Sequence, residues 1–277
     1  LCISDIAPRK LTDDELSIFK MIGKLVNDMI RMNKMASLQE EIQESKKRLE
    51  TLNSELYESN RFHKELFGQY MSPSLLEKVL SNKNETQLGG EEKDVTVLIS
   101  DLRGFSPLSE KYNAKTIVEI LNIYFEEMID IIHDHEGYIN EILGDGILVV
   151  FGAIKDVHDT AIKAVDCARE MQKGLKRVNA KLRIKGLPPL EMGIGINNGN
   201  LVVGNIGSKR RMKYGVVGEN INIAARIESL TVAGQVLISE SLYELIEGKI
   251  KPIGNMRTKI KGFKEPIMIY DVSEMID

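Results

Sequence analysis

Two aspartates, Asp101 and Asp145, have the positions in this 277-residue sequence that most suggest chemistry. Asp101 follows a β-rich apolar stretch, and Asp145 lies in a turn between two further predicted strands. If those strands are neighbours in one sheet, both carboxylates converge at one edge. Two carboxylates with open positions suit Mg²⁺ or Mn²⁺ ions that also bind a polyphosphate. Taken singly, Asp101 is as simply explained as a helix cap and Asp145 as a turn residue.

A second pair, Asn222 and Arg226, lies four residues apart in a predicted helix over residues 220–230. This spacing places both side chains on one helical face. A fixed guanidinium suits the stabilisation of charge that develops on a phosphate, because its donors need little reorganisation. Without a context, Arg226 is equally a surface residue of the helix.

The elements that must position these residues alternate between strand and helix from about residue 93 to residue 277. Their order, β-α-β-β-α-β, predicts an α+β fold with a ferredoxin-like sheet and helices on one face. An Asn-Gly pair at 198–199 predicts a hairpin. The expected elements are 95–99, 114–135, 138–142, 147–151, 157–180, 192–196, 201–203, 220–230, 236–239, a short helix from Ser239, and strands near Lys259 and Ile267.

Three regions precede this domain. In residues 1–36, Thr12 and Glu15 have capping-box spacing, and a helix with one apolar face should follow. Residues 37–67 carry most of a heptad pattern and predict a parallel two-stranded coiled coil; a single amphipathic helix lying on a neighbouring domain is the alternative. The pattern breaks at residues 67–70. Within residues 68–92 we expect a short helix from Ser72, which would transmit signals, and then a polar linker.

Composition excludes several classes of protein. A formal net charge of −4 argues against a nucleic-acid-binding protein. No apolar run reaches the roughly 18 residues that suggest a membrane span. The two cysteines, Cys2 and Cys167, match no metal-binding spacing and fit a reducing cytosol, so we expect a cytoplasmic protein. Because the sequence begins inside an apolar segment without Met, we expect an upstream domain.

Three motifs occur in order along the chain, at residues 99–106, 142–152 and 214–226. Together they resemble the two metal-binding segments and the Asn-x-x-x-Arg helix of class III adenylyl and guanylyl cyclases, and the resemblance spans residues 91–277. Residues 1–36 resemble the C-terminal end of a GAF domain, with a strand at 1–3 and a Pro-Arg-x-Leu turn at 8–11.

The resemblance to class III cyclases implies a reaction and a set of roles. The ribose 3′-hydroxyl of a nucleoside triphosphate attacks its own α-phosphate, and pyrophosphate leaves. Two metal ions per site are implied. The family also implies a homodimer with two active sites at its interface, each site taking its metal-binding residues from one chain and its base-reading and transition-state residues from the other.

The residues are carried over position by position. The implied metal-binding residues are Asp101, Leu102 and Asp145. Arg226 would stabilise charge at the α-phosphate, and Asn222 would orient the ribose. The implied substrate-binding residues include Gly104 and Phe105, and a C-terminal lysine that contacts the terminal phosphates. Lys261 is our choice for that lysine, with Lys259 and Lys264 close by.

The positions that read the base differ from those of cyclases acting on ATP. Such cyclases generally carry Lys four residues before the second metal aspartate and Asp or Thr seven before the helix Asn. Here these positions are Glu141 and Gly215. A carboxylate can accept hydrogen bonds from guanine N1–H and its amino group, whereas adenine would face it with a lone pair. We therefore expect GTP as substrate and cyclic GMP as product. An adenylyl cyclase with an unusual base pocket and a non-catalytic dimeric signalling module are the alternatives.

Overall fold

A computed structural model of the chain describes residues 11–70, 75–76, 78, 87–154, 158–259 and 266–273. The chain divides into two compact units, one ending at Tyr70 and the other beginning at Met71. The strand expected at residues 1–3 and the turn at 8–11 fall almost entirely outside the described residues, as does most of the short helix expected from Ser72.

The first unit consists of one helix, α1 (Asp13–Tyr70), which is 58 residues long. Its start is a capping box: the Thr12 amide donates to Oε2 of Glu15 over 2.9 Å, and the Glu15 amide donates to Oγ1 of Thr12 over 3.4 Å. The helix continues through Tyr70, so the break in the heptad pattern at residues 67–70 falls within its last turn. Among the described residues, no helix combines the length and hydropathy that a bilayer crossing requires.

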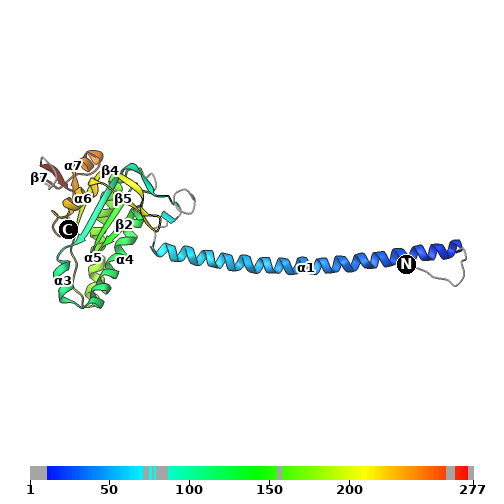
Figure 1. The fold of residues 1–277 in the computed structure, drawn as a ribbon. Helices are drawn as coiled ribbons and strands as arrows, with labels where there is room; N and C mark the ends of the chain where they lie inside the picture. Colours follow the sequence, from blue (N-terminus) through cyan, green and yellow to red (C-terminus); the bar gives the residue numbers. More distant parts are fainter. Residues whose placement is uncertain are drawn as a thin grey trace. The chain divides into compact units, whose positions relative to one another are not determined.

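The second unit is built on a mixed sheet with the strand order β2-β3-β1-β4-β6-β8-β7, and β5 pairs with β4 (Figure 1). The first four of these strands have the ferredoxin-like arrangement predicted from the sequence. The strands are β1 (Gly89–Leu102), β2 (Tyr138–Leu143), β3 (Gly146–Phe151), β4 (Met192–Ser208), β5 (Arg211–Val217), β6 (Val236–Ser239), β7 (Gly254–Thr258) and β8 (Ile267–Asp271).

Helices cover both faces of this sheet. The main core contains α4 (Ala114–Asp134), α5 (Thr160–Ile184) and α7 (Glu240–Ile246), which pack on one face together with Leu98 of β1. Val97 and Ile99 alternate with Leu98 and enter a second core, where α6 (Glu219–Glu228) contributes Ala224. The expectation of helices on one face therefore holds for α4 and α5, which belong to the ferredoxin-like unit, and α6 is an addition on the other face.

β1 begins at Gly89, so the predicted linker was wrong over residues 89–92. Gly90 pairs with Gly204 of β4 in an antiparallel ladder. A Cβ on Gly204 would lie 2.2 Å from the Gly89 carbonyl oxygen and 2.4 Å from Gly90 Cα. Glycines are therefore required here because the two backbones approach too closely for side chains, rather than because the segment is a linker.

β4 is continuous, so the hairpin predicted at Asn198-Gly199 was also wrong. Asn198 lies opposite Thr96 in the middle of the β1–β4 ladder. Its side chain accepts from Thr96 Oγ1 over 2.7 Å and donates to Asp94 over 2.8 Å. Gly199 leaves room for the carboxamide of Asn220, which a Cβ would approach to 2.4 Å. The polar side chain that indicated a turn, that of Asn198, therefore forms hydrogen bonds to the neighbouring strand instead.

Candidate active site

The structure brings Asp101 and Asp145 together at one edge of the sheet. Asp101 lies near the end of β1, where Ser100 pairs with Ile147 of β3. Asp145 lies in the tight turn between β2 and β3, close enough to Asp101 for its charge to act on the Asp101 carboxyl group. The turn can approach β1 this closely because Gly146 has no side chain; a Cβ there would lie 3.2 Å from Oδ1 of Asp101. The predicted convergence of the two carboxylates is confirmed.

The electrostatics of this pair favour a bound cation. Burial raises the pKa of Asp101, and the neighbouring charge of Asp145 raises it further, whereas Arg103 lowers it. In the described part of the chain, no group of three or more His, Cys, Asp or Glu residues is placed to hold a metal ion. Two hard oxygen donors leave coordination positions for substrate oxygens, so the residues present fit Mg²⁺ or Mn²⁺ shared with a polyphosphate. Leu102, carried over as a third metal-binding residue, is buried beside Asp101.

The segment after β1 turns sharply into the short helix α3 (Phe105–Lys111). Gly104 precedes this helix with φ of 69°, in the left-handed region that favours glycine. Phe105 is partly buried and packs against the main core. The two residues predicted to bind substrate are therefore held directly after the carboxylate strand.

Arg103 forms a network that the sequence analysis did not identify. Its guanidinium contacts the Glu228 carboxylate, donates to the Glu228 carbonyl oxygen over 2.8 Å and donates to Thr231 Oγ1 over 2.5 Å. Glu228 is 8% exposed. A Cβ on Gly193 would overlap Thr231 and Arg103, so this glycine makes room for the network. A signal was present, because Glu228 follows Ala224 by one helical turn on the apolar face of a predicted helix.

Asn222 and Arg226 lie on the outer face of α6. The residues that this helix buries are Ala224, Ile227 and Glu228. Arg226 is offset from both Ala224 and Glu228 by two residues, or roughly 200° around the helix, and Asn222 lies one turn before it. Asn222 is exposed and Arg226 is partly buried. The predicted shared face is thus confirmed, and it is turned away from the side on which Glu228 meets Arg103.

Glu141 lies on β2 and Gly215 lies on β5, and side-chain contacts join these two strands. Two residues that recognise the same base must lie near each other in this way. Glu141 of β2 forms an ion pair with Lys213 of β5 at 3.1 Å, and both side chains are 50% exposed. Tyr138, at the start of β2, donates its hydroxyl to the carbonyl oxygen of Tyr214 over 2.9 Å. Gly215 follows Tyr214 directly and is buried.

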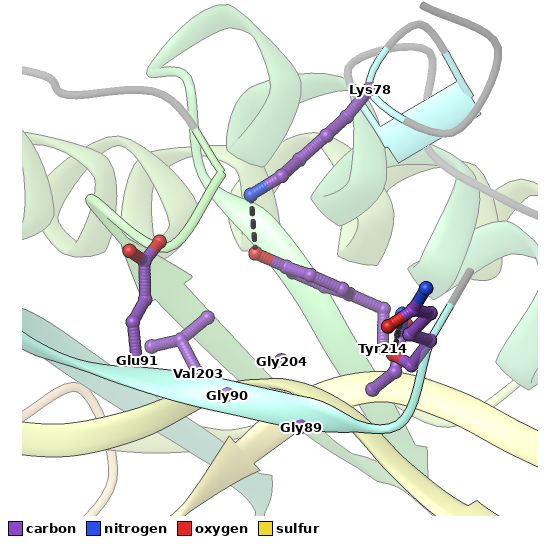
Figure 2. A pocket seen from close by; sticks show the side chains of 9 residues that line it. Lys78, Gly89, Gly90, Glu91, Val203, Gly204 and Tyr214 are labelled. Carbon is purple, nitrogen blue, oxygen red and sulfur yellow. Dashed lines mark hydrogen bonds between the residues drawn. The ribbon is translucent and has the colours of Figure 1, made fainter. Parts of the chain in front are cut away.

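A pocket of about 250 Å³ lies beside Tyr214 (Figure 2). Lys78 extends to the tyrosine, and its Nζ donates to the hydroxyl over 3.0 Å. The same Nζ lies 5.0 Å from the ring centroid, and the tyrosine hydroxyl donates to the Ala153 carbonyl oxygen over 3.2 Å. Lys78, which follows α1 in the sequence, therefore contacts β5, the strand that carries Gly215. The pocket is lined by Lys78, Gln87, Gly89, Gly90, Glu91, Val203, Gly204, Asn205 and Tyr214.

The choice of a phosphate-binding lysine stays a prediction. Lys261 and Lys264 lie outside the described residues. Lys259 is described; it is exposed and directly follows β7.

Comparison with known proteins shows that most of the chain matches one protein family. Residues 90–274, about two thirds of the chain, match the family described as "Adenylate and Guanylate cyclase catalytic domain". The crystal structure of the guanylyl cyclase Cya2 is similar, with 50% identity and a TM-score of 0.65, over 67% of this chain and 94% of that one. The adenylyl cyclase CyaB from P. aeruginosa is 36% identical with a TM-score of 0.65, over 68% of this chain and 98% of that one.

A curated relative extends the same comparison. Adenylate cyclase 1 of Rhizobium meliloti (strain 1021) is 28% identical over 212 residues, which are 74% of this chain and 31% of that protein. The chain spans about a third of the length of the curated relatives it matches. Similar proteins thus include cyclases named for each of the two purine nucleotides. On the family match and the shared fold, the chain belongs to the adenylate and guanylate cyclase catalytic domain family.

Proposed function

We propose that this nucleotide cyclase domain converts GTP to cyclic GMP and pyrophosphate. The observation that carries the proposal is the proximity of the Asp101 and Asp145 carboxyl groups at one edge of the sheet, together with a carboxylate, Glu141, at the position that corresponds to base recognition. The first feature supports metal-assisted chemistry on a polyphosphate, and the second supports guanine as the base.

In the proposed reaction the 3′ oxygen forms a bond to the α-phosphorus, and the bond from that phosphorus to the β-phosphate oxygen breaks. The hydroxyl proton passes to solvent water, and pyrophosphate departs with the bonding electrons. Two Mg²⁺ or Mn²⁺ ions held by Asp101 and Asp145 would supply activation of the attacking oxygen and stabilisation of the leaving one. Arg226 stabilises negative charge on the α-phosphate, and Asn222 orients the ribose.

The base is read through hydrogen bonds that guanine can form and adenine cannot. Glu141 accepts from N1–H and from the 2-amino group, and its carboxylate is paired with Lys213 in the structure. Adenine presents an unprotonated N1 to the same carboxylate, which leaves both groups without a hydrogen bond. A site that is built to bond a donor discriminates strongly against a substrate that lacks it.

Each active site forms between two copies of the chain. The orientation of α6 supports this arrangement, because Arg226 faces away from the side on which Glu228 meets Arg103, two residues after Asp101. A second chain that approaches this outer face would bring its own carboxylate pair to Arg226 and Asn222. A two-fold symmetric dimer then has two equivalent sites.

The long helix supplies a second dimer contact and a route for regulation by an upstream sensor. Its apolar heptad positions are exposed in one copy; Leu49 is 62% exposed and Leu56 is 60% exposed. A parallel coiled coil with a second copy would cover them. Residues 68–92 then transmit the state of the helix, and the bond between Lys78 and Tyr214 links that segment to the base-reading strand.

Conversion of ATP to cyclic AMP is the second candidate, favoured by the 36% identity with the adenylyl cyclase CyaB. The two candidates differ at positions 141 and 215. In the proposed function, Glu141→Lys combined with Gly215→Asp shifts the preference towards ATP, since the lysine donates to adenine N1 and the new carboxylate accepts from N6. The overall rate falls, because the surrounding pocket suits the original pair.

The test is to measure cyclic GMP and cyclic AMP formed by the purified chain from GTP and ATP in separate reactions with Mn²⁺ or Mg²⁺. We expect cyclic GMP from the unaltered chain and a larger share of cyclic AMP from the double variant. Cyclic AMP as the main product of the unaltered chain would reject GTP specificity. A double variant that still used only GTP would reject Glu141 as the base reader.

A further inference from the structure

β2 carries a bulge at Asn140, directly before the proposed base-reading residue. Ile139 lies opposite Val149 and Glu141 lies opposite the next residue, Leu148, so Asn140 is the additional residue of the bulge. Bulges re-aim side chains and are frequent beside active sites. Here the bulge allows two consecutive side chains to serve one region of the surface.

Asn140 lies where the side chain of residue 215 would begin. A Cβ built on Gly215 would lie 3.0 Å from Oδ1 of Asn140. The backbone of Gly215 is not in the left-handed region, so its conformation alone does not require glycine. The volume that a larger residue would use at position 215 is therefore taken by the carboxamide of Asn140.

The amide oxygen of Asn140 lacks a hydrogen bond. It is closed off from solvent, and no donor reaches it among the residues that the structure describes. Leaving a buried acceptor unpaired is unfavourable, and such groups need an explanation. The residue itself is only partly buried. Rotation about its Cβ–Cγ bond can therefore turn the oxygen towards a donor that arrives from the open side.

We propose that Asn140 is a specificity-determining residue whose amide oxygen accepts a hydrogen bond from the 2-amino group of guanine. That group has two hydrogens, so Glu141 accepts one hydrogen together with N1–H, and Asn140 accepts the other. Asn140 thereby supplies the second base contact that Gly215 cannot make. This inference rests on the proposed preference for GTP and deepens it by naming the atom that is read.

The test compares GTP with ITP, which retains N1–H and O6 but lacks the 2-amino group. Asn140→Ala should lower kcat/KM for GTP about tenfold, the effect of one lost hydrogen bond, and leave kcat/KM for ITP unchanged. The matched control is Asn255→Ala, an exposed asparagine on β7 that should change neither value. An equal loss with both nucleotides, or no loss with GTP, would overturn the proposal.

A second variant tests the same contact without removing the asparagine. In Gly215→Ala the new methyl group displaces the carboxamide, so the ratio of kcat/KM for GTP to that for ITP should fall. In the Asn140→Ala background the same change should have little further effect on this ratio. Additive losses would overturn the shared contact.

The nucleotide preference of the unaltered chain distinguishes failure of the proposed function from failure of the role proposed for Asn140. If it prefers ATP to GTP, the proposed function fails. If it prefers GTP, but both variants keep the original ratio of GTP to ITP, only the role of Asn140 fails.

Discussion

At the scale of single residues, Asp101 and Asp145 form an electrostatically unfavourable pair. Two neighbouring carboxylates repel each other when both are ionised, and burial further disfavours the ionised form of Asp101. The surrounding fold maintains this arrangement, and a bound cation would relieve the repulsion. The pair therefore has a simple physical interpretation as a site that is completed by metal and substrate.

Replacing Asp145 with Asn should lower turnover by at least about two orders of magnitude, because it removes one metal ligand and its charge. The melting temperature should not fall, since the change also removes repulsion from Asp101. Asp134→Asn, at the exposed end of α4, is the matched control and should retain full activity. Near-normal turnover by Asp145→Asn would show that this carboxylate is not part of the reaction site.

Cys167 is a buried packing residue of α5. Burial raises the pKa of its thiol to about 12, so the folded chain keeps it protonated at neutral pH. Its contribution to stability is complete below the pKa of an unfolded thiol, about 8.5, and is lost as the pH rises towards 12. In a Cys2→Ser background, iodoacetamide should leave Cys167 unmodified at pH 8.5 until denaturant is added. Rapid alkylation of the folded chain would contradict this placement.

At the scale of elements, the network around Arg103 joins the end of β1 to the end of α6. Asp101 lies two residues before Arg103, and Arg226 lies two residues before Glu228. The ion pair thus connects the segment that carries the carboxylates with the helix that carries the proposed transition-state residue. In a dimer with shared sites, these two groups of one chain serve different active sites.

Removing one partner of this network should destabilise the domain. Glu228→Ala leaves the Arg103 guanidinium largely buried without its carboxylate, and we expect a loss of about 2–3 kcal/mol in the free energy of unfolding. Glu219→Ala, on the exposed first turn of the same helix, should change it little. Urea denaturation measures both values. Equal stability of the two variants would mean that the ion pair contributes nothing.

Most of the elements could be predicted because their hydrophobic periodicity is determined locally. The β-α-β-β-α-β order followed from that periodicity, and the order alone placed Asp101 near Asp145. The hairpin at Asn198-Gly199 was mispredicted because local turn propensity lost to side-chain hydrogen bonds with distant strands. The glycines at the start of β1 were misread for a similar reason, since their cause is the close approach of β4.

Site residues that lie within one sequence motif could be predicted. Residues whose role depends on partners far away in the sequence could not. Glu228 gave only a weak signal, because the partner that stabilises it is 125 residues away in the sequence. Asn140 belongs to no functional pattern in the sequence and is notable there only for its place beside Glu141. Its significance depends on a bulge and on the absence of a side chain at Gly215, which no local pattern indicates.

At the scale of the whole molecule, the heptad face of α1 is exposed, and the proposed coiled coil with a second copy would cover it. Removing residues 1–66 should weaken the dimer and make specific activity fall on dilution, as sedimentation and activity measurements at several enzyme concentrations would show. Leu49→Lys with Leu56→Lys in the full chain should have the same effect, because both changes place charge in the seam. Glu50→Lys, outside the seam, is the control. A truncated chain whose dimer is as tight as the original would exclude α1 from the interface.

The central claim is that two copies of this chain together form each cyclase site, with the carboxylates from one and Arg226 from the other. The most direct test is to mix Asp145→Ala and Arg226→Ala chains, each inactive alone, and to measure cyclic GMP formation after subunit exchange. Each heterodimer then carries one site with both lesions and one intact site. Statistical exchange should restore roughly a quarter of the activity per chain of the unaltered protein. No recovery, despite demonstrated exchange, would contradict the account.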